Sequence, residues 1–219
     1  QLTTGGYLDY LRNERPEDEI TVFFYPTANG PCRFGQYQDF MRDLVAKQKI
    51  RNVAFLSTSS KDGYGGLGHK TTLMIYTSVV IADIFEDMYH AMLVNAVNPE
   101  KAVRKLNEIW EYVLRGLEGG KANFYTAIEK ASSELAEIEH KTRLKSLPHV
   151  LIVGEIYVRK DGISRRWLPE RLAEKGIVSH VAPLHEWLHY VDWLVMTKEN
   201  EFSDSWRQRM KTRIKNTIM

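Results

Sequence analysis

The chain has 219 residues, of which 43% are hydrophobic and 26% are charged, and its formal net charge is +2. This length suffices for one well-buried core, and the charged fraction is ordinary for a globular domain. So small a net charge argues against a nucleic acid or an anionic membrane surface as the partner. No apolar run reaches the roughly 18 residues of a membrane-spanning helix, and the first residues lack the pattern of a secretory signal.

The single cysteine, Cys32, cannot form a disulfide within the chain. Because no export signal is present, a reducing compartment is the default, and we predict a cytoplasmic location. The sequence starts at Gln1 rather than at methionine, and residues 211–215 have the pattern of a helix that continues. We therefore expect the sequence to be a segment of a longer protein.

Short apolar runs bounded by turn residues predict four β-strands. They lie at residues 20–25, 53–57, 149–154 and 177–181. Because the runs are continuously apolar and alternate with helical patterns, they indicate a parallel sheet covered on both faces.

Helical patterns fill most of the remaining chain, and three of them separate the second strand from the third. Asn98 and Pro99 form a cap and first position for the middle one, and Gly119-Gly120 ends it. The predicted helices span about 34–47, 70–95, 99–118, 121–144, 165–175 and 184–196. We predict an α/β fold, with a parallel doubly wound (flavodoxin- or Rossmann-like) sheet in residues 1–69 and 146–219 and a helical insertion in residues 70–145.

Ligands of such sheets bind at the carboxyl ends of the strands, which directs attention to the segment after the first strand. There Cys32 precedes a predicted helix and stands beside Arg33. The helix dipole and the neighbouring guanidinium both favour the thiolate, the form that binds metal or attacks a substrate. The alternative is a small buried residue in a tight turn.

Two segments carry a resemblance to a known family. Residues 27–37 read TANGPCRFGQY, and residues 154–159 read GEIYVR, followed by EKG at 174–176 and by Ala182-Pro183. In their residues and in their order along the chain, these segments resemble the activator-related proteins of 2-hydroxyacyl-CoA (2-hydroxyglutaryl-CoA) dehydratases, the CoA-substrate-specific enzyme activase family. The resemblance covers most of the chain, with the helical middle less diagnostic, and corresponds to the dehydratase-like C-terminal part of that family.

The resemblance implies an iron–sulfur protein that delivers electrons for an acyl-CoA dehydratase-type reaction. Cys32 is then a cluster ligand, although a cluster needs three or four thiolates and the others must lie outside this sequence. The cofactor site implied in this way comprises Cys32, Arg33, Gln36, Tyr37, Glu155 and Arg159. ATP is implied at a separate upstream module, and no cofactor is expected on this segment alone. The implied partners are other domains of the same protein, a dehydratase or electron donor, and an acyl-CoA substrate.

Residues 63–68 (GYGGLG) fit the G-x-G-x-x-G pattern of dinucleotide-binding loops. That interpretation requires the glycines directly after a strand, whereas residues 57–62 intervene here. Glu86 and Asp87, about twenty positions on, fall inside a predicted helix instead of at a strand end. A glycine-rich loop at the edge of the sheet is the favoured interpretation.

Residues 185–189 (HEWLH) fit the H-E-x-x-H pattern, in which two histidines on one helix face bind zinc and the glutamate acts as base. A third ligand is not evident, although Glu199 and Glu201 lie downstream. We therefore expect His185→Ala to lose no metal and to cost no more than a surface substitution. A zinc hydrolase remains one alternative function, and a non-catalytic module that binds a small molecule or a partner is the other.

Overall fold

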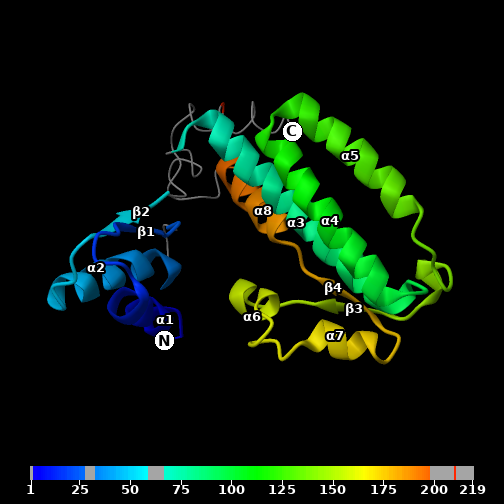
Figure 1. Cartoon of the computed structure of the whole chain (residues 1–219), viewed down its shortest axis with the longest axis horizontal. Helices are drawn as coiled ribbons and strands as arrows, with labels where there is room; N and C mark the ends of the chain where they lie inside the picture. The colour runs from blue at the N-terminus through cyan, green and yellow to red at the C-terminus, as the bar shows by residue number, and fades with distance from the viewer. Residues whose placement is uncertain (1, 28–32, 59–66, 198–209, 211–219) are drawn as a thin grey trace. The chain divides into compact units, whose positions relative to one another are not determined.

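The computed structural model describes residues 2–27, 33–58, 67–197 and 210. Helices and short parallel strands make it a mixed α/β structure (Figure 1). The chain divides into two compact units, one formed by Gln1–Thr72 with Asp192–Met219 and the other by Leu73–Val191. No helix in the described ranges combines the length and apolar character needed to cross a membrane.

The first unit contains a small parallel sheet packed against helices. Its elements are α1 (Leu2–Asp9), a π-helical turn (Tyr10–Glu14), β1 (Thr21–Phe24), a 3-10 turn (Arg33–Gln36), α2 (Tyr37–Lys47) and β2 (Val53–Leu56). β1 pairs in parallel with β2, with Thr21 opposite Val53. Because side chains alternate along a strand, Phe23 and Phe55 point to one face and pack on a core that contains Tyr7 and Met41.

The opposite face of the β1–β2 pair is apolar and exposed. Val22, Phe24 and Leu56 expose 58%, 52% and 43% of their surface. The sequence predicted a sheet covered on both faces, whereas this apolar face of the β1–β2 pair is exposed.

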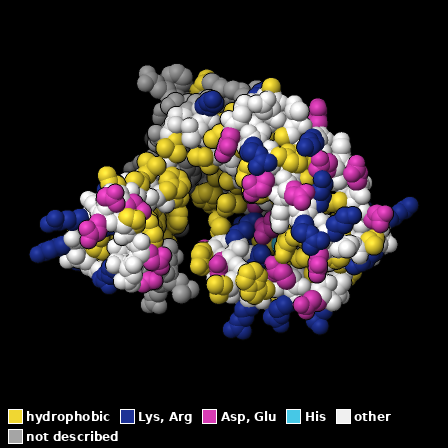
Figure 2. Space-filling model, viewed as in Figure 1, with side chains coloured by type: hydrophobic (Ala, Val, Ile, Leu, Met, Phe, Trp, Pro, Cys, Tyr) yellow, Lys and Arg dark blue, Asp and Glu magenta, His cyan; other side chains and the backbone are white. Residues whose placement is uncertain are grey.

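Three long helices make up most of the second unit: α3 (His69–Asn95), α4 (Pro99–Glu118) and α5 (Lys121–Ala136). They run alongside one another in Figure 1, and their shared core includes Ile81, Ile109 and Val113. The predicted start of α4 is confirmed, since Asn98 accepts a hydrogen bond from the Lys101 amide at 3.0 Å. Charged side chains of both signs are interspersed over α4 and α5 (Figure 2).

The predicted helix over 121–144 is too long, because α5 ends at Ala136. The chain after α5 instead pairs with the end of α3. The Lys141 amide donates to the Asn95 carbonyl at 2.8 Å, and the Asn95 side chain donates to the Thr142 carbonyl at 2.9 Å. Asn95 thus supplies long-range hydrogen bonds that compete with continuation of the helix.

The second unit also holds the other strand pair, β3 (His149–Ile152) and β4 (Val178–Val181), which is parallel. The connection between them contains the short helices α6 (Ile156–Lys160) and α7 (Leu168–Ala173), and α8 (Leu184–Thr197) follows β4. Gly176 takes a positive φ of 73°, which turns the chain from α7 into β4. Val178 and Val181 of β4 are buried.

All four predicted strands are present, and they form two parallel pairs, β1 with β2 and β3 with β4. Within the described residues they form two separate two-stranded sheets, whereas the sequence predicted one doubly wound sheet. Residues 70–145 are helical apart from turns and a single bridge between Ala96 and His140, as predicted. These helices belong to the same compact unit as β3 and β4.

Candidate functional site

The segment predicted to hold the cofactor is described only in part. Cys32 lies outside the described residues, as do Gly63 to Gly66 of the glycine-rich loop. Arg33 and Gln36 bound the 3-10 turn that leads into α2, and Tyr37 is the first residue of α2. All three side chains are exposed, so each is available to a ligand or to another part of a longer protein.

Glu155 and Arg159, predicted to contact the cofactor, organise the loops at the carboxyl ends of β3 and β4. The Glu155 carboxylate caps α6 by accepting a hydrogen bond from the Val158 amide at 2.9 Å. The Arg159 guanidinium donates to the Gly154 carbonyl at 2.6 Å and to the Pro183 carbonyl at 3.5 Å. Arg159 therefore joins the backbone that follows β3 to the backbone that follows β4.

A network of ionised side chains, here called the α3 ionic cluster, lies beside this edge and was not predicted. It consists of Asp83 and Glu86 from α3, Lys160 from α6, Arg165 from the following loop and Glu170 from α7. The Lys160 ammonium lies 2.8 Å from Asp83 Oδ1 and also contacts Glu86. The Arg165 guanidinium lies 3.1 Å from Glu86 and 3.8 Å from Glu170.

The cluster is largely withdrawn from water. The exposed side-chain fraction is 6% for Asp83, 10% for Arg165 and 25% for Lys160. Burial raises the pKa of Asp83, but hydrogen bonds from Lys160 and from the amides of His185 and Leu184 outweigh it, and the net pKa lies below the ordinary value. Asp83 is therefore an ionised carboxylate at neutral pH, and its neighbours supply the compensation that a buried charge requires.

The H-E-x-x-H segment meets this cluster at the start of α8. Asp83 Oδ2 accepts the backbone N–H of His185 at 2.9 Å and lies 3.0 Å from His185 Nδ1. His185 is thus more constrained than the surface residue that the sequence predicted. Glu186, by contrast, is exposed. Among the described residues no group of three or more His, Cys, Asp or Glu side chains could hold a metal ion.

Two further histidine contacts lie in the same unit. His189 Nε2 lies 2.9 Å from the Tyr76 hydroxyl, and the His189 ring is perpendicular to that of His185 at a centroid distance of 5.9 Å. On the strand pair, His149 Nδ1 lies 2.9 Å from His180 Nε2, and the two rings are stacked. His180 also approaches Asp87 at 3.4 Å. Imidazoles therefore recur around the acidic face of α3.

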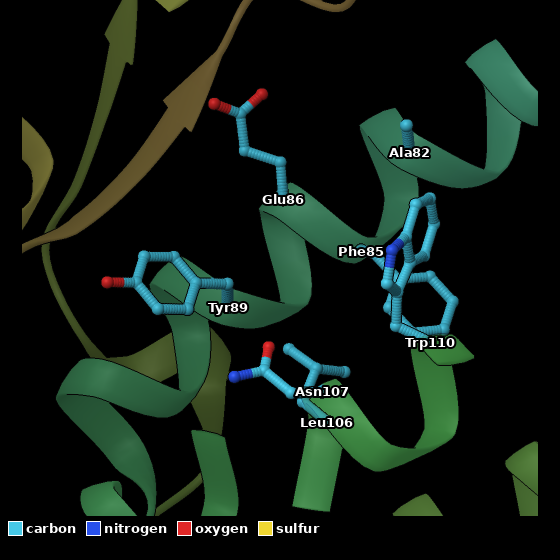
Figure 3. Close-up of a pocket in the computed structure, with 7 residues that line it drawn as sticks. All are labelled: Ala82, Phe85, Glu86, Tyr89, Leu106, Asn107 and Trp110. Carbon is cyan, nitrogen blue, oxygen red and sulfur yellow. The ribbon is translucent and has the colours of Figure 1, made fainter. Parts of the chain in front are cut away.

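A shallow pocket of about 250 Å³ lies between α3 and α4 (Figure 3). Its lining is mainly aromatic and apolar, comprising Ala82, Phe85, Glu86, Tyr89, Leu106, Asn107 and Trp110. The Phe85 and Trp110 rings contact each other at a centroid distance of 5.0 Å. Figure 3 shows the Glu86 carboxylate pointing away from these two rings, which is consistent with its engagement by Lys160 and Arg165.

The sequence contained one signal for the ionic cluster that was not used. Asp83, Glu86 and His90 follow one another at intervals of three and four residues, with Asp87 next to Glu86, within a helix that is otherwise largely apolar. Residues at this spacing share a face, so a polar stripe within an apolar helix indicates polar partners from elsewhere in the fold. The cations that supply those partners, Lys160 and Arg165, are more than seventy positions away.

Comparison with known proteins gives no further constraint, because no family model, no curated protein and no solved structure matches this chain.

Proposed function

We propose that this chain is part of an iron–sulfur protein related to the 2-hydroxyacyl-CoA dehydratases and their ATP-dependent activators. In this proposal the full protein delivers electrons, at the expense of ATP, to an acyl-CoA dehydratase-type reaction in the cytoplasm. Cys32 is one ligand of the cluster, and the remaining ligands come from parts of the protein outside this sequence.

The observation that carries the proposal is the position of the resembling segments relative to the strands. Residues 27–37 begin three residues after β1, and residues 154–159 begin two residues after β3. Ala182-Pro183 follows β4 directly. All of these strands belong to parallel pairs, and α/β proteins bind ligands beyond the carboxyl ends of such strands. The doubly wound, flavodoxin-like order of the strands is part of the same proposal.

Local geometry at β1 and β2 supports a binding role for these ends. The Thr27 amide donates to the Thr58 carbonyl at 2.7 Å, so the parallel pairing continues past β1 and β2. Thr27, from which the chain continues toward Cys32, is therefore held in place by this hydrogen bond. Arg33 and Tyr37, which follow Cys32 in the sequence, have exposed side chains that could contact an anionic cofactor or substrate.

The test uses the full natural protein, purified without oxygen. Iron and acid-labile sulfide are measured together with the electron paramagnetic resonance spectrum of the reduced protein. We expect stoichiometric cluster in the parent and a loss of iron in Cys32→Ser. Ser133→Ala, an exposed substitution on α5, is the matched control and should keep its iron. A parent protein without iron, or a Cys32→Ser variant with full iron and full electron transfer, would show that the proposal is wrong.

A non-catalytic binding module is the second candidate, and the α3–α4 pocket is the observation that favours it. The Phe85, Tyr89 and Trp110 rings suit a small planar or apolar ligand. This role is tested by measuring tryptophan fluorescence while such ligands are added to the parent and to Trp110→Leu. A binding role predicts a change in fluorescence in the parent that is lost in the variant. Ligand binding to an iron-free parent would favour the module over the electron-transfer protein.

A further inference from the structure

The Asp83–His185 contact fixes which nitrogen of the imidazole carries a proton. Asp83 Oδ2 accepts the His185 backbone N–H, and His185 Nδ1 lies 3.0 Å from the same oxygen. Because an ionised carboxylate can only accept hydrogen bonds, Nδ1 must be the protonated nitrogen. Lys160 occupies Oδ1 of the same carboxylate at 2.8 Å and helps to hold it in place.

The other ring nitrogen, Nε2, is left as the acceptor of the neutral imidazole. It makes no hydrogen bond within the part of the chain that the structure describes, and it is not buried. The His185 side chain is 28% exposed, whereas Asp83 behind it is 6% exposed. A buried carboxylate thus orients a solvent-accessible imidazole, the arrangement in which histidine acts as a general base in hydrolases.

We propose that Asp83 and His185 form a carboxylate–imidazole dyad in which His185 Nε2 is a general base toward the hydroxyl group of water or of a small substrate at the α8 N-terminus. The lone pair of Nε2 takes the proton, the O–H bond breaks and its electrons stay on oxygen. The oxygen then forms a bond to the carbonyl carbon of an ester, and the bond between that carbon and the departing alcohol or phenol oxygen breaks. The imidazolium, stabilised by the adjacent Asp83 carboxylate, gives its proton to the departing oxygen. Asp83 is a positioning residue. This activity is separate from the proposed electron transfer and requires no iron–sulfur cluster.

The nearest alternative base on the same helix is His189, and its surroundings differ. His189 Nε2 contacts the Tyr76 hydroxyl at 2.9 Å, and the structure gives it no carboxylate partner within the described residues. The two histidines are four residues apart, so they share a helix face, and His189 is the more exposed of the two. His189→Gln is therefore a matched control for His185→Gln.

The test measures hydrolysis of 4-nitrophenyl acetate, which yields acetate and 4-nitrophenol when water attacks the ester. We expect His185→Gln to lose about a hundredfold of the protein-dependent rate, the lower end of what a general base contributes. Asp83→Asn should also lower the rate strongly, because the imidazole loses the carboxylate that orients it. His189→Gln should keep at least half of the rate. An unchanged rate in His185→Gln or in Asp83→Asn would overturn the proposal.

A second measurement requires no variant. The ¹⁵N chemical shifts of the wild-type histidines report which ring nitrogen is protonated, and we expect His185 to carry its proton on Nδ1. Asp83 accepts from Lys160 and twice from His185, and a single amide oxygen cannot replace both carboxylate oxygens. Asp83→Asn should therefore shift the tautomer. Protonation of Nε2 alone in the wild type would refute the dyad even if every variant failed to fold.

Discussion

Removal of the Lys160 ammonium is the most direct test of the α3 ionic cluster. Lys160→Met keeps the apolar stem and leaves Asp83 and Glu86 without the cation that lies between them. Truncating one partner of a fully buried ion pair costs about 3–5 kcal/mol, because a charge is left uncompensated. Since the Lys160 side chain is 25% exposed, water and Arg165 offset part of this cost. We expect the free energy of unfolding to fall by about 2–4 kcal/mol.

The matched control is Lys105→Met on α4. Lys105 lies 2.7 Å from Glu134, about as close as Lys160 lies to Asp83, but its side chain is 37% exposed. Ion pairs at such exposed positions contribute little to stability, so distance alone does not decide the outcome. The comparison therefore separates burial from proximity.

Urea unfolding at neutral pH, followed by far-ultraviolet circular dichroism, gives both free energies by linear extrapolation. Lys160→Met should lower the urea midpoint clearly, and Lys105→Met should leave it nearly unchanged. If the two variants lose the same stability, the ionic cluster contributes no more than a surface pair, and the reasoning from burial is refuted.

Three further predictions follow from single side chains. Burial raises the pKa of Asp83, but hydrogen bonds hold it below the ordinary value of 3.8. The stability that ionised Asp83 contributes is therefore present above pH 3.8 and is lost as the pH falls through the folded pKa. Asp83→Asn should remove this loss, so that stability depends less steeply on pH below about pH 4. Burial lowers the pKa of His90 below its ordinary value of 6.5. The unfolded chain therefore binds a proton at His90 that the folded chain does not, and the folded protein should lose stability as the pH falls below 6.5. His90→Phe should remove this part of the decrease in urea midpoint between pH 7.5 and pH 5.5. Asn98→Ala removes the cap of α4 and should cost about 1 kcal/mol in urea unfolding, whereas Asn98→Ser should keep most of that stability.

Much of the secondary structure could be predicted because its causes are local. The apolar runs at 20–25 and 149–154 contain β1 and β3, and the cap at Asn98 with the glycines after α4 bounded that helix. The N-terminal helix α1 was missed, since Thr3, Thr4, Gly5 and Gly6 favour a helix poorly. Its formation depends on packing of Tyr7 against Met41 and Phe23, which no local pattern contains.

The candidate site was predictable only in outline. Parallel-sheet logic directed attention to the segment after β3, where Glu155 and Arg159 lie, and their contact with a cofactor stays a prediction. It could not predict that Arg159 would bind backbone carbonyls, because the choice among acceptors depends on the path of both loops. Cys32 lies outside the described residues, so its role stays a prediction.

The sequence by itself determined the four strands, their parallel pairing and most of the helices, because hydrophobic periodicity and caps act over a few residues. Only the tertiary structure decided that Asp83 on α3 meets Lys160 on α6 and His185 on α8. These contacts join residues 77 and 102 positions apart. A buried carboxylate is stable only where the packed helices bring its donors together, and that condition belongs to the fold as a whole rather than to any local segment.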